Sequence, residues 1–379
     1  MRNKIMLSLI VWVGIASAAL AAKFSPGDLQ KNFNVTKGGR LVVSVSAGDI
    51  SVKVWDKMEV EMTARNIGDE ADHVVAEQDG NTVKVEYHSK WGWSNANRDL
   101  RFEFRVPKEF NVDLKTSGGD IGVSGALAGD ASVQTSGGDL VLDGISGKVE
   151  GKTSGGDITV KDIEGAATLS TSGGDIHIGH AAKDLQISTS GGDINVGTVD
   201  SSLRATTSGG DIQISKVGGN LNAFTSSGNI TAGNVGGNVT ISTSGGDITL
   251  SSGKGRVKAS TSGGDVDVRG VVGSAKISSS GGTVKVDLTP KGDEASSIES
   301  SGGDVYLYIP PDAKATIRAE VSGDEDSKVV SDFPVAYKSS GEGDRQRAEC
   351  LLNGGGQEIY LHTSGGNVYL KNGSGPTGK

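Results

Sequence analysis

The chain has 379 residues, with 37 Lys and Arg against 46 Asp and Glu, so its formal net charge is −9. This acidic balance disfavours nucleic acid and anionic lipid as partners. Only 4% of the residues are aromatic while 59 are glycine, a composition that suits a narrow core of small aliphatic side chains better than a large globular one. Cys350 is the only cysteine, which excludes an intramolecular disulfide and favours a small buried thiol over a reactive or intermolecular one.

Residues 1–22 have the layout of a secretory signal peptide. Arg2 and Lys4 precede an apolar run, and small residues lead to an expected cleavage after Ala21 or Ala22. The run is short for a membrane span, so we expect no transmembrane segment once it is removed. The sequence therefore predicts an exported protein, located in the periplasm or at the cell surface.

Residues 23–115 predict a β-rich cap and the first coils. Short stretches alternate as half-buried strands do, and Asp79, Gly80 and Asn81 predict a hairpin turn. A first coil has no neighbour on one side, and large side chains that cover this open end are what a cap needs. The aromatic residues here are Trp55, Tyr87, Trp91, Trp93, Phe102, Phe104 and Phe110. The alternative for Trp91 and Trp93 is a ligand-stacking surface.

Residues 116–304 repeat one phrase, Thr-Ser-Gly-Gly-Asp-Ile, at steps of 19, then eight times 18, then 21 residues. The phrase starts at Thr116, Thr135, Thr153, Thr171, Thr189, Thr207, Thr225, Thr243, Thr261, Ser279 and Ser300. Counting each repeat from this residue as position 1, apolar residues occupy positions 6, 8, 11, 15 and 17, for example Ile194, Val196, Val199, Leu203 and Ala205. This alternation predicts two short strands per repeat with one buried side.

These features predict an all-β fold, a single-stranded parallel β-helix or β-solenoid of about 18-residue coils with strand-rich caps at both ends. Because the apolar positions do not recur every six residues, the pattern favours a right-handed coil. The alternative of a disordered Gly- and Ser-rich segment conflicts with the strict apolar positions. We expect the Thr at position 1 to lie at the inner edge and bond to the next Thr. We expect the glycines of positions 3 and 4 to form a corner through positive φ.

Residues 305–370 predict C-terminal coils and a second cap, and residues 371–379 a frayed tail. The register is lost after Asp304 and returns at Asn367. Three segments resemble the bacterial putative-adhesin domain family, a β-strand-repeat family of unknown function. They are Gly48 to Trp55, Phe104 to Pro107 leading into the repeats, and Leu352 to Val368. The resemblance implies the same fold and association with the surface or envelope, and it brings no catalytic residues.

Position 5 holds a row of acidic residues, here called the aspartate row. Its members are Asp120, Asp139, Asp157, Asp175, Asp193, Asp211, Asn229, Asp247, Asp265, Thr283, Asp304 and Asn367. Stacked coils about 4.8 Å apart would place like charges side by side, a repulsion on the order of 1 kcal/mol per pair. Backbone N–H groups at the corners are the expected compensation, and bound calcium is the alternative.

The sequence has two further candidate sites, a pair of histidines and an outward polar face. His177 and His180 lie three residues apart without a third ligand, which favours a solvated turn over a zinc site. Outward positions 16, 18 and 2 form what we call the hydroxyl face, for example Gln186, Ser188, Ser190, Arg204, Thr206, Ser208, Thr240, Ser242 and Ser244. Solubility alone explains such a face, and the functional alternatives are many weak contacts with a glycan or envelope polymer, or ordering of water as on an ice-binding surface.

The sequence thus predicts a non-catalytic exported module with no catalytic, cofactor or metal residues assigned. Its expected partner is a glycan, a cell-envelope polymer or a surface protein. The alternative is a polysaccharide-active enzyme or a calcium-dependent binder on the same scaffold.

Overall fold

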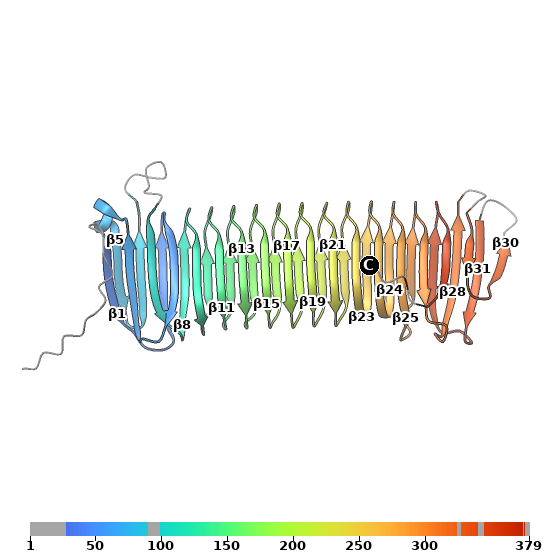
Figure 1. The fold of residues 1–379 in the computed structure, drawn as a ribbon, viewed down its shortest axis with the longest axis horizontal. Coiled ribbons are helices and arrows are strands. Elements are labelled where there is room, and N and C mark those ends of the chain that lie inside the picture. Colours follow the sequence, from blue (N-terminus) through green and yellow to red (C-terminus); the bar gives the residue numbers. More distant parts are fainter. Residues whose placement is uncertain (1–27, 90–98, 324–326, 340–344, 374, 376–379) are drawn as a thin grey trace, which may run out of the picture.

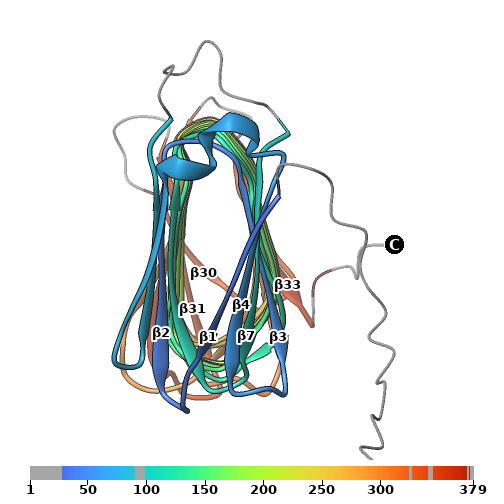
Figure 2. The same cartoon turned by 90° about the vertical axis from the view of Figure 1, so that its left-hand side faces the viewer.

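The computed structural model describes residues 28–89, 99–323, 327–339, 345–373 and 375. Its strands stack along one long axis, with their directions nearly perpendicular to that axis (Figure 1). The view along the axis shows two walls of strands joined at both edges, with one short 3₁₀ helix at the N-terminal end (Figure 2). The all-β, solenoid-like architecture predicted from the repeats is confirmed.

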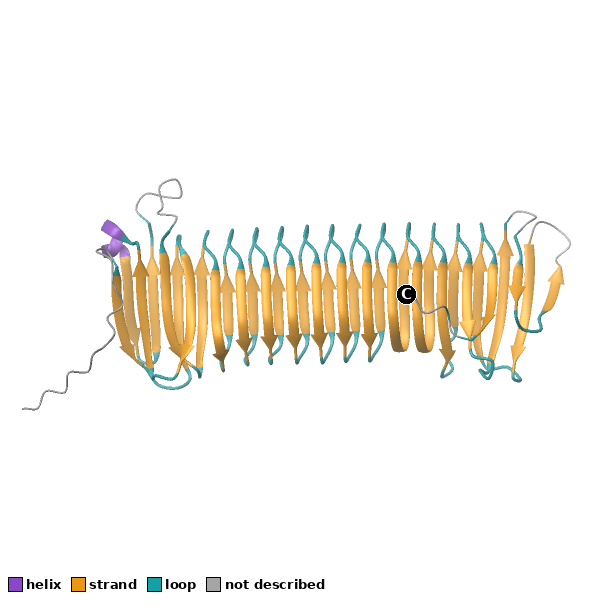
Figure 3. Ribbon diagram, in the orientation of Figure 1, coloured by secondary structure: helices purple, strands orange, loops and turns teal. Residues whose placement is uncertain are grey.

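Each 18-residue repeat contributes two strands, and each strand pairs in parallel with the corresponding strand of the next repeat (Figure 3). In one repeat these are β17 (Ile194–Val199) and β18 (Leu203–Thr206). Ile194 stands opposite Ile212, and Leu203 opposite Leu221, so the register advances by one repeat. We call the wall that contains β17 side A and the wall that contains β18 side B.

The repeat strands on side A are β9 (Ile121–Leu127), β11 (Leu140–Ile145), β13 (Ile158–Ile163), β15 (Ile176–Ala181), β17, β19 (Ile212–Val217) and β21 (Ile230–Val235). Those on side B are β10 (Ala131–Gln134), β12 (Val149–Lys152), β14 (Ala167–Ser170), β16 (Leu185–Ser188), β18, β20 (Leu221–Phe224) and β22 (Val239–Ser242). Two 14-residue strands, β23 (Ile248–Thr261) and β24 (Val266–Ser279), bend from side A to side B. They are followed by β25 (Val284–Pro290) on side A and β26 (Ser296–Ser300) on side B.

The core lies between the two walls and consists of the apolar residues that the repeat pattern identified. Ile194, Val196, Val199, Leu203 and Ala205 are all at most 1% exposed. Identical positions stack on one another from coil to coil, so each residue buries its surface against its neighbours above and below. Removing this apolar surface from water is the main favourable term in such a fold.

Two predictions about the corner between the walls are wrong. Thr189 is buried as expected, but its hydroxyl donates to the carbonyl of Gly174 in the preceding coil (2.9 Å) and accepts the N–H of Gly192 (3.3 Å). The corner glycines do not adopt positive φ. Gly192 is required by close approach instead, because a Cβ there would lie 2.1 Å from the Gly174 carbonyl oxygen.

At the N-terminal end the order of the coils is inverted relative to the sequence. The first coil of the chain, residues 39–55, lies next to the repeats, and later segments lie outside it. Side B continues through β8 (Phe110–Thr116), β2 (Gly39–Val45), β6 (Thr82–Tyr87) and β5 (Val74–Asp79). Side A continues through β3 (Asp49–Trp55), β7 (Arg101–Pro107), β4 (Glu59–Arg65) and β1 (Leu29–Asn34), and η1 (Gly68–His73) precedes β5. The predicted hairpin turn joins β5 to β6, and Gly80 there has φ +56°.

At the C-terminal end the order of the coils is also inverted relative to the sequence. β26 pairs with β32 (Gln357–Thr363), which pairs with β28 (Ala315–Ser322), and beyond it lie β31 (Arg345–Leu352) and β30 (Ala336–Ser339). On side A, β27 (Val305–Ile309) pairs with β33 (Val368–Asn372), which pairs with β29 (Val329–Ser331). The last coil of the chain, β32 and β33, therefore contacts the repeats. The strands that precede it in the sequence, β28 to β31, lie on its outer side.

Aromatic residues cover the N-terminal end as the sequence predicts. Tyr87, Phe102, Phe104 and Phe110 are buried, and the rings of Tyr87 and Phe102 lie 5.5 Å apart. Trp55 is half-buried, with its indole N–H on the Glu59 carbonyl (2.8 Å).

Candidate functional site

The aspartate row is held by backbone hydrogen bonds. The Oδ1 of Asp175 accepts the N–H of Asp193 at 2.7 Å, and the Oδ1 of Asp193 accepts the N–H of Asp211 at 2.8 Å. Asn229 makes the same contact through its amide oxygen to the N–H of Asp247 (2.8 Å). Each side chain thus satisfies a corner N–H of the next coil, which offsets repulsion along the row. This is the compensation that the sequence predicts.

The row also incorporates both ends of the chain. Asp49 accepts the N–H of Asp120 (3.1 Å), and the row continues to Thr283. It resumes at Asp304, and beyond it the Oδ1 of Asn367 accepts the N–H of Lys328 (2.9 Å). In the part of the chain that the structure describes, no three His, Cys, Asp or Glu side chains gather where they could hold a metal ion.

The two histidines lie on a strand rather than in a solvated turn, so that prediction is wrong. His177 and His180 belong to β15, where His177 is exposed. His180 is half-buried between carboxylates of the neighbouring coils, with Nδ1 2.6 Å from Asp162 Oδ1 and Nε2 3.0 Å from Asp200 Oδ2. The hydrogen bond with Asp162, followed by that with Asp200, raises the pKa of His180. The arrangement ties three coils together.

The hydroxyl face lies on side B and is not uniformly flat. A shallow hollow of about 270 Å³ crosses five successive coils, from Lys148, just before β12, to Asn222 in β20. The polar residues that line it are Lys148, Thr168, Asp184, Gln186, Ser202, Arg204 and Asn222. Arg204 also lies over the ring of Phe224, 5.4 Å from its centre. The hollow is elongated along the stacking axis, because equivalent positions of successive coils line it.

Position 2 adds a row of serines along one edge of side B. Ser136, Ser154, Ser172, Ser190, Ser208, Ser226, Ser244, Ser262 and Ser280 are all exposed. From Ser136 to Ser244, the backbone carbonyl of the serine accepts a hydrogen bond from the following coil, as when Ser190 N–H and Gly191 N–H both donate to the Ser172 carbonyl. The hydroxyl groups therefore point to solvent from a rigid, regularly spaced backbone.

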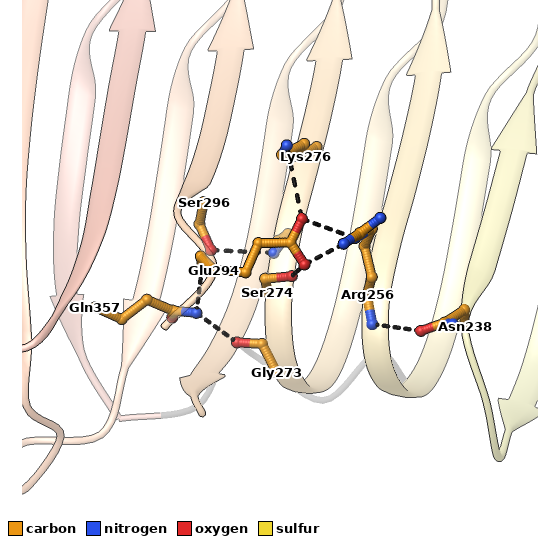
Figure 4. Close-up of polar contacts among 9 residues, drawn as sticks. Asn238, Arg256, Gly273, Ser274, Lys276, Glu294, Ser296 and Gln357 are labelled. Carbon is orange, nitrogen blue, oxygen red and sulfur yellow. Dashed lines mark hydrogen bonds and ion pairs between the residues drawn. The ribbon is translucent and has the colours of Figure 1, made fainter. Parts of the chain in front are cut away.

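A cluster around Glu294 was not identified from the sequence (Figure 4). Glu294 follows β25, and its carboxylate accepts from Arg256 Nε (2.8 Å) and Ser274 Oγ (3.2 Å), with Lys276 Nζ at 3.7 Å. The hydrogen bond with Arg256, then the one with Ser274, lowers the pKa of Glu294. The available signal was the repeat of 21 rather than 18 residues, since its extra residues include this carboxylate.

Gln357 completes the cluster from the first residue of β32. Its Nε2 donates to the carbonyl oxygens of Glu294 (2.6 Å) and Gly273 (3.3 Å), so it joins the last coil to the two before it. Its buried Oε1 accepts no hydrogen bond from the described residues. The cluster fixes the register where the repeat length changes, which is a structural role.

Trp91, Trp93 and the signal-peptide pattern of residues 1–22 lie outside the described residues. Cys350 is a buried free thiol, as expected, and burial raises its pKa. Among the described residues, no helix has the length and apolar character needed to cross a membrane.

Comparison with protein families gives one match, to the family described as Toastrack DUF4097, over residues 39–218 and 197–371. Together these matches span nearly all of the strands. The chain belongs to the Toastrack family. This confirms the resemblance to a putative-adhesin domain family of unknown function, which the segments around Trp55, Pro107 and Val368 suggested. A comparison with curated proteins found no match.

Similar solved structures include a putative adhesin from Bacteroides fragilis (10% identity, 93% of this chain and 100% of that chain, TM-score 0.23). Others are a putative adhesin from Parabacteroides merdae (15%, 74% and 98%, 0.28) and a putative lipid binding protein from Parabacteroides distasonis (13%, 92% and 98%, 0.22). No property of these proteins is assigned to the chain from this similarity.

Proposed function

We propose that this Toastrack chain is an exported, non-catalytic binding module that holds a repetitive glycan or envelope polymer along its hydroxyl face. The observation that carries the proposal is the elongated hollow on side B, where four successive coils each add one polar side chain at the same register position, Thr168, Gln186, Arg204 and Asn222. Five strands at about 4.8 Å spacing give a contact length of about 19 Å. A linear polymer with its own repeat fits a surface of this kind better than a compact ligand does.

The hollow has the chemistry of weak, multiple contacts. Gln186 and Arg204 are exposed at equivalent positions of adjacent coils, and Asn222 follows in the next. Amide and guanidinium groups supply donors for sugar hydroxyls, while Gln and Asn oxygens accept from them. No single contact needs to be strong, because contacts repeated along one rigid face add.

Three carboxylates of the scaffold support a non-catalytic role because each is engaged in holding neighbouring coils together. Asp193 accepts a backbone N–H, Glu294 pairs with Arg256, and Asp162 pairs with His180. Export is supported by the leader-like composition of residues 1–22, with the periplasm or the cell surface as destination. The proposal includes a right-handed coil. It is supported by the apolar positions of the repeat, which do not recur every six residues.

Co-sedimentation with insoluble peptidoglycan and capsular polysaccharide tests the proposal. The Gln186→Ala/Arg204→Ala variant should lose at least tenfold in affinity, whereas Gln213→Ala, at an exposed position of side A, should bind like the unmodified chain. Failure of the unmodified chain to bind either polymer, or equal binding by all three proteins, would overturn it. Release of new reducing ends from either polymer would indicate an enzyme instead.

A further inference from the structure

The C-terminal end of side B carries a second hollow, outside the repeats. It has a volume of about 420 Å³ and is lined by Arg318, Ala319, Glu320, Arg347, Ala348, Glu349 and Tyr360. These residues come from β28, β31 and β32, which continue side B beyond β26. The volume falls in the range of about 300–1000 Å³ that small-ligand sites occupy.

We propose that this hollow binds one neutral sugar residue of a glycan chain, with Tyr360 beneath the ring and the Arg and Glu side chains on its hydroxyl groups. The inference deepens the proposed function by naming a separate end site on the same wall. It depends on different residues from the elongated hollow, so each can fail without the other.

Charge pairing favours a neutral ligand. Arg347 lies 3.2 Å from Glu320, and Arg318 lies 3.6 Å from Glu349 and 3.3 Å from Glu358. The two arginines face three glutamates, so no excess positive charge attracts an anion, and an arginine lies beside each glutamate, which weakens the attraction of a cation. A neutral hydroxyl group needs no counter-charge.

The same pairs retain hydrogen-bonding capacity. A guanidinium has five N–H donors and a carboxylate about four acceptor sites, so an ion-paired Arg and Glu can still donate to and accept from a ligand. The pairing of β28 with β31 places Arg318 opposite Glu349 and Glu320 opposite Arg347, so donors and acceptors alternate across the hollow. Neighbouring hydroxyl groups of a sugar, each both donor and acceptor, complement this alternation.

Tyr360 provides the apolar part of the site. It is 38% exposed, and its hydroxyl donates to Glu320 Oε2 at 3.4 Å. Burial of the ring, followed by the nearby Glu320 carboxylate, raises its pKa. The nearly parallel ring of His362, centred 6.1 Å away, extends the aromatic surface. A partly exposed aromatic ring with its polar tip already bonded suits the C–H face of a sugar ring.

Titration calorimetry with maltohexaose, cellohexaose and chitohexaose, and with tetragalacturonate as the anionic probe, tests this assignment. At least one neutral probe should bind, and Tyr360→Ala should weaken that binding at least tenfold. Arg347→Lys, which keeps the charge but loses the planar fork, should weaken it several-fold.

Two controls separate this site from its alternatives. Tyr369→Ala removes an outward aromatic residue of the same coil on side A, and Gln213→Ala changes an exposed residue of side A that lines neither hollow; both should bind the hexasaccharide normally. Thermal melting confirms that each variant is folded. Binding of tetragalacturonate alone, no binding of any neutral probe, or unchanged binding by folded Tyr360→Ala and Arg347→Lys would overturn the proposal.

Discussion

The backbone N–H of Asn367 donates to the carboxylate of Asp304 across 2.8 Å, although 63 residues separate them in the sequence. The coil that lies next to Asp304 is therefore the one that contains the last repeat phrase of the chain, which begins at Thr363. The contact repeats the one made between successive coils from Asp120 to Thr283, and Thr363 likewise donates to the Gly303 carbonyl (2.7 Å). The same corner contacts therefore join coils that are distant in the sequence.

The aspartate row gives the first prediction. Asp193→Asn should change stability by less than about 0.5 kcal/mol, because an amide oxygen can still accept the Asp211 N–H, as Asn229 does for Asp247. Asp193→Ala should cost about 1 kcal/mol through loss of that hydrogen bond. Urea unfolding measures both. If calcium were the compensation, a chelator would lower the melting temperature of the unmodified protein, and we expect no change.

The corner glycines give a matched pair of substitutions. Gly192→Ala places a Cβ 2.1 Å from the Gly174 carbonyl oxygen and should cost about 3 kcal/mol. Gly191→Ala meets its nearest atom, the Gly173 carbonyl oxygen, at 3.5 Å and should be nearly neutral. Ser227 already occupies the equivalent position in another coil. Equal melting temperatures for the two variants would contradict close approach as the reason for glycine.

His180 gives a prediction about pH. Its pKa is raised in the folded state, so its contribution is present in full below the unfolded pKa of about 6.5 and is lost as pH rises through the folded pKa. The side chain is 39% exposed, so the contribution should be below about 1 kcal/mol. Unfolding curves between pH 5 and pH 9 should show this loss. His180→Asn should remove it, while His177→Asn, on the exposed position of the same strand, should not.

The sequence was sufficient to predict the strands and the core of the repeats. Ile194 and Leu203 could be placed in the core because an apolar residue recurs at the same position of successive coils, and a strand has only two faces. The reason for Gly192 could not be read in the same way, because close approach depends on the path of the next coil. The sequence placed His180 in a turn rather than on a strand, and it gave no sign of the role of Gln357. The partners of both residues are single residues in other coils, without a recurring spacing.

The last prediction concerns how damage spreads in a stack. Ile194→Asp puts a carboxylate among apolar residues where the surface is 1% exposed, which should cost about 4 kcal/mol or more. Each coil contacts only its neighbours, so the loss should concentrate in the coils that hold Ile176 and Ile212, the register partners of Ile194. Hydrogen exchange should show lost protection over residues 171–224 and native protection near both ends. Ser190→Asp, on the exposed corner of the same coil, is the control and should leave the exchange pattern unchanged. Uniform loss of protection along the whole stack would mean that the coils unfold as one unit, contrary to nearest-neighbour stacking.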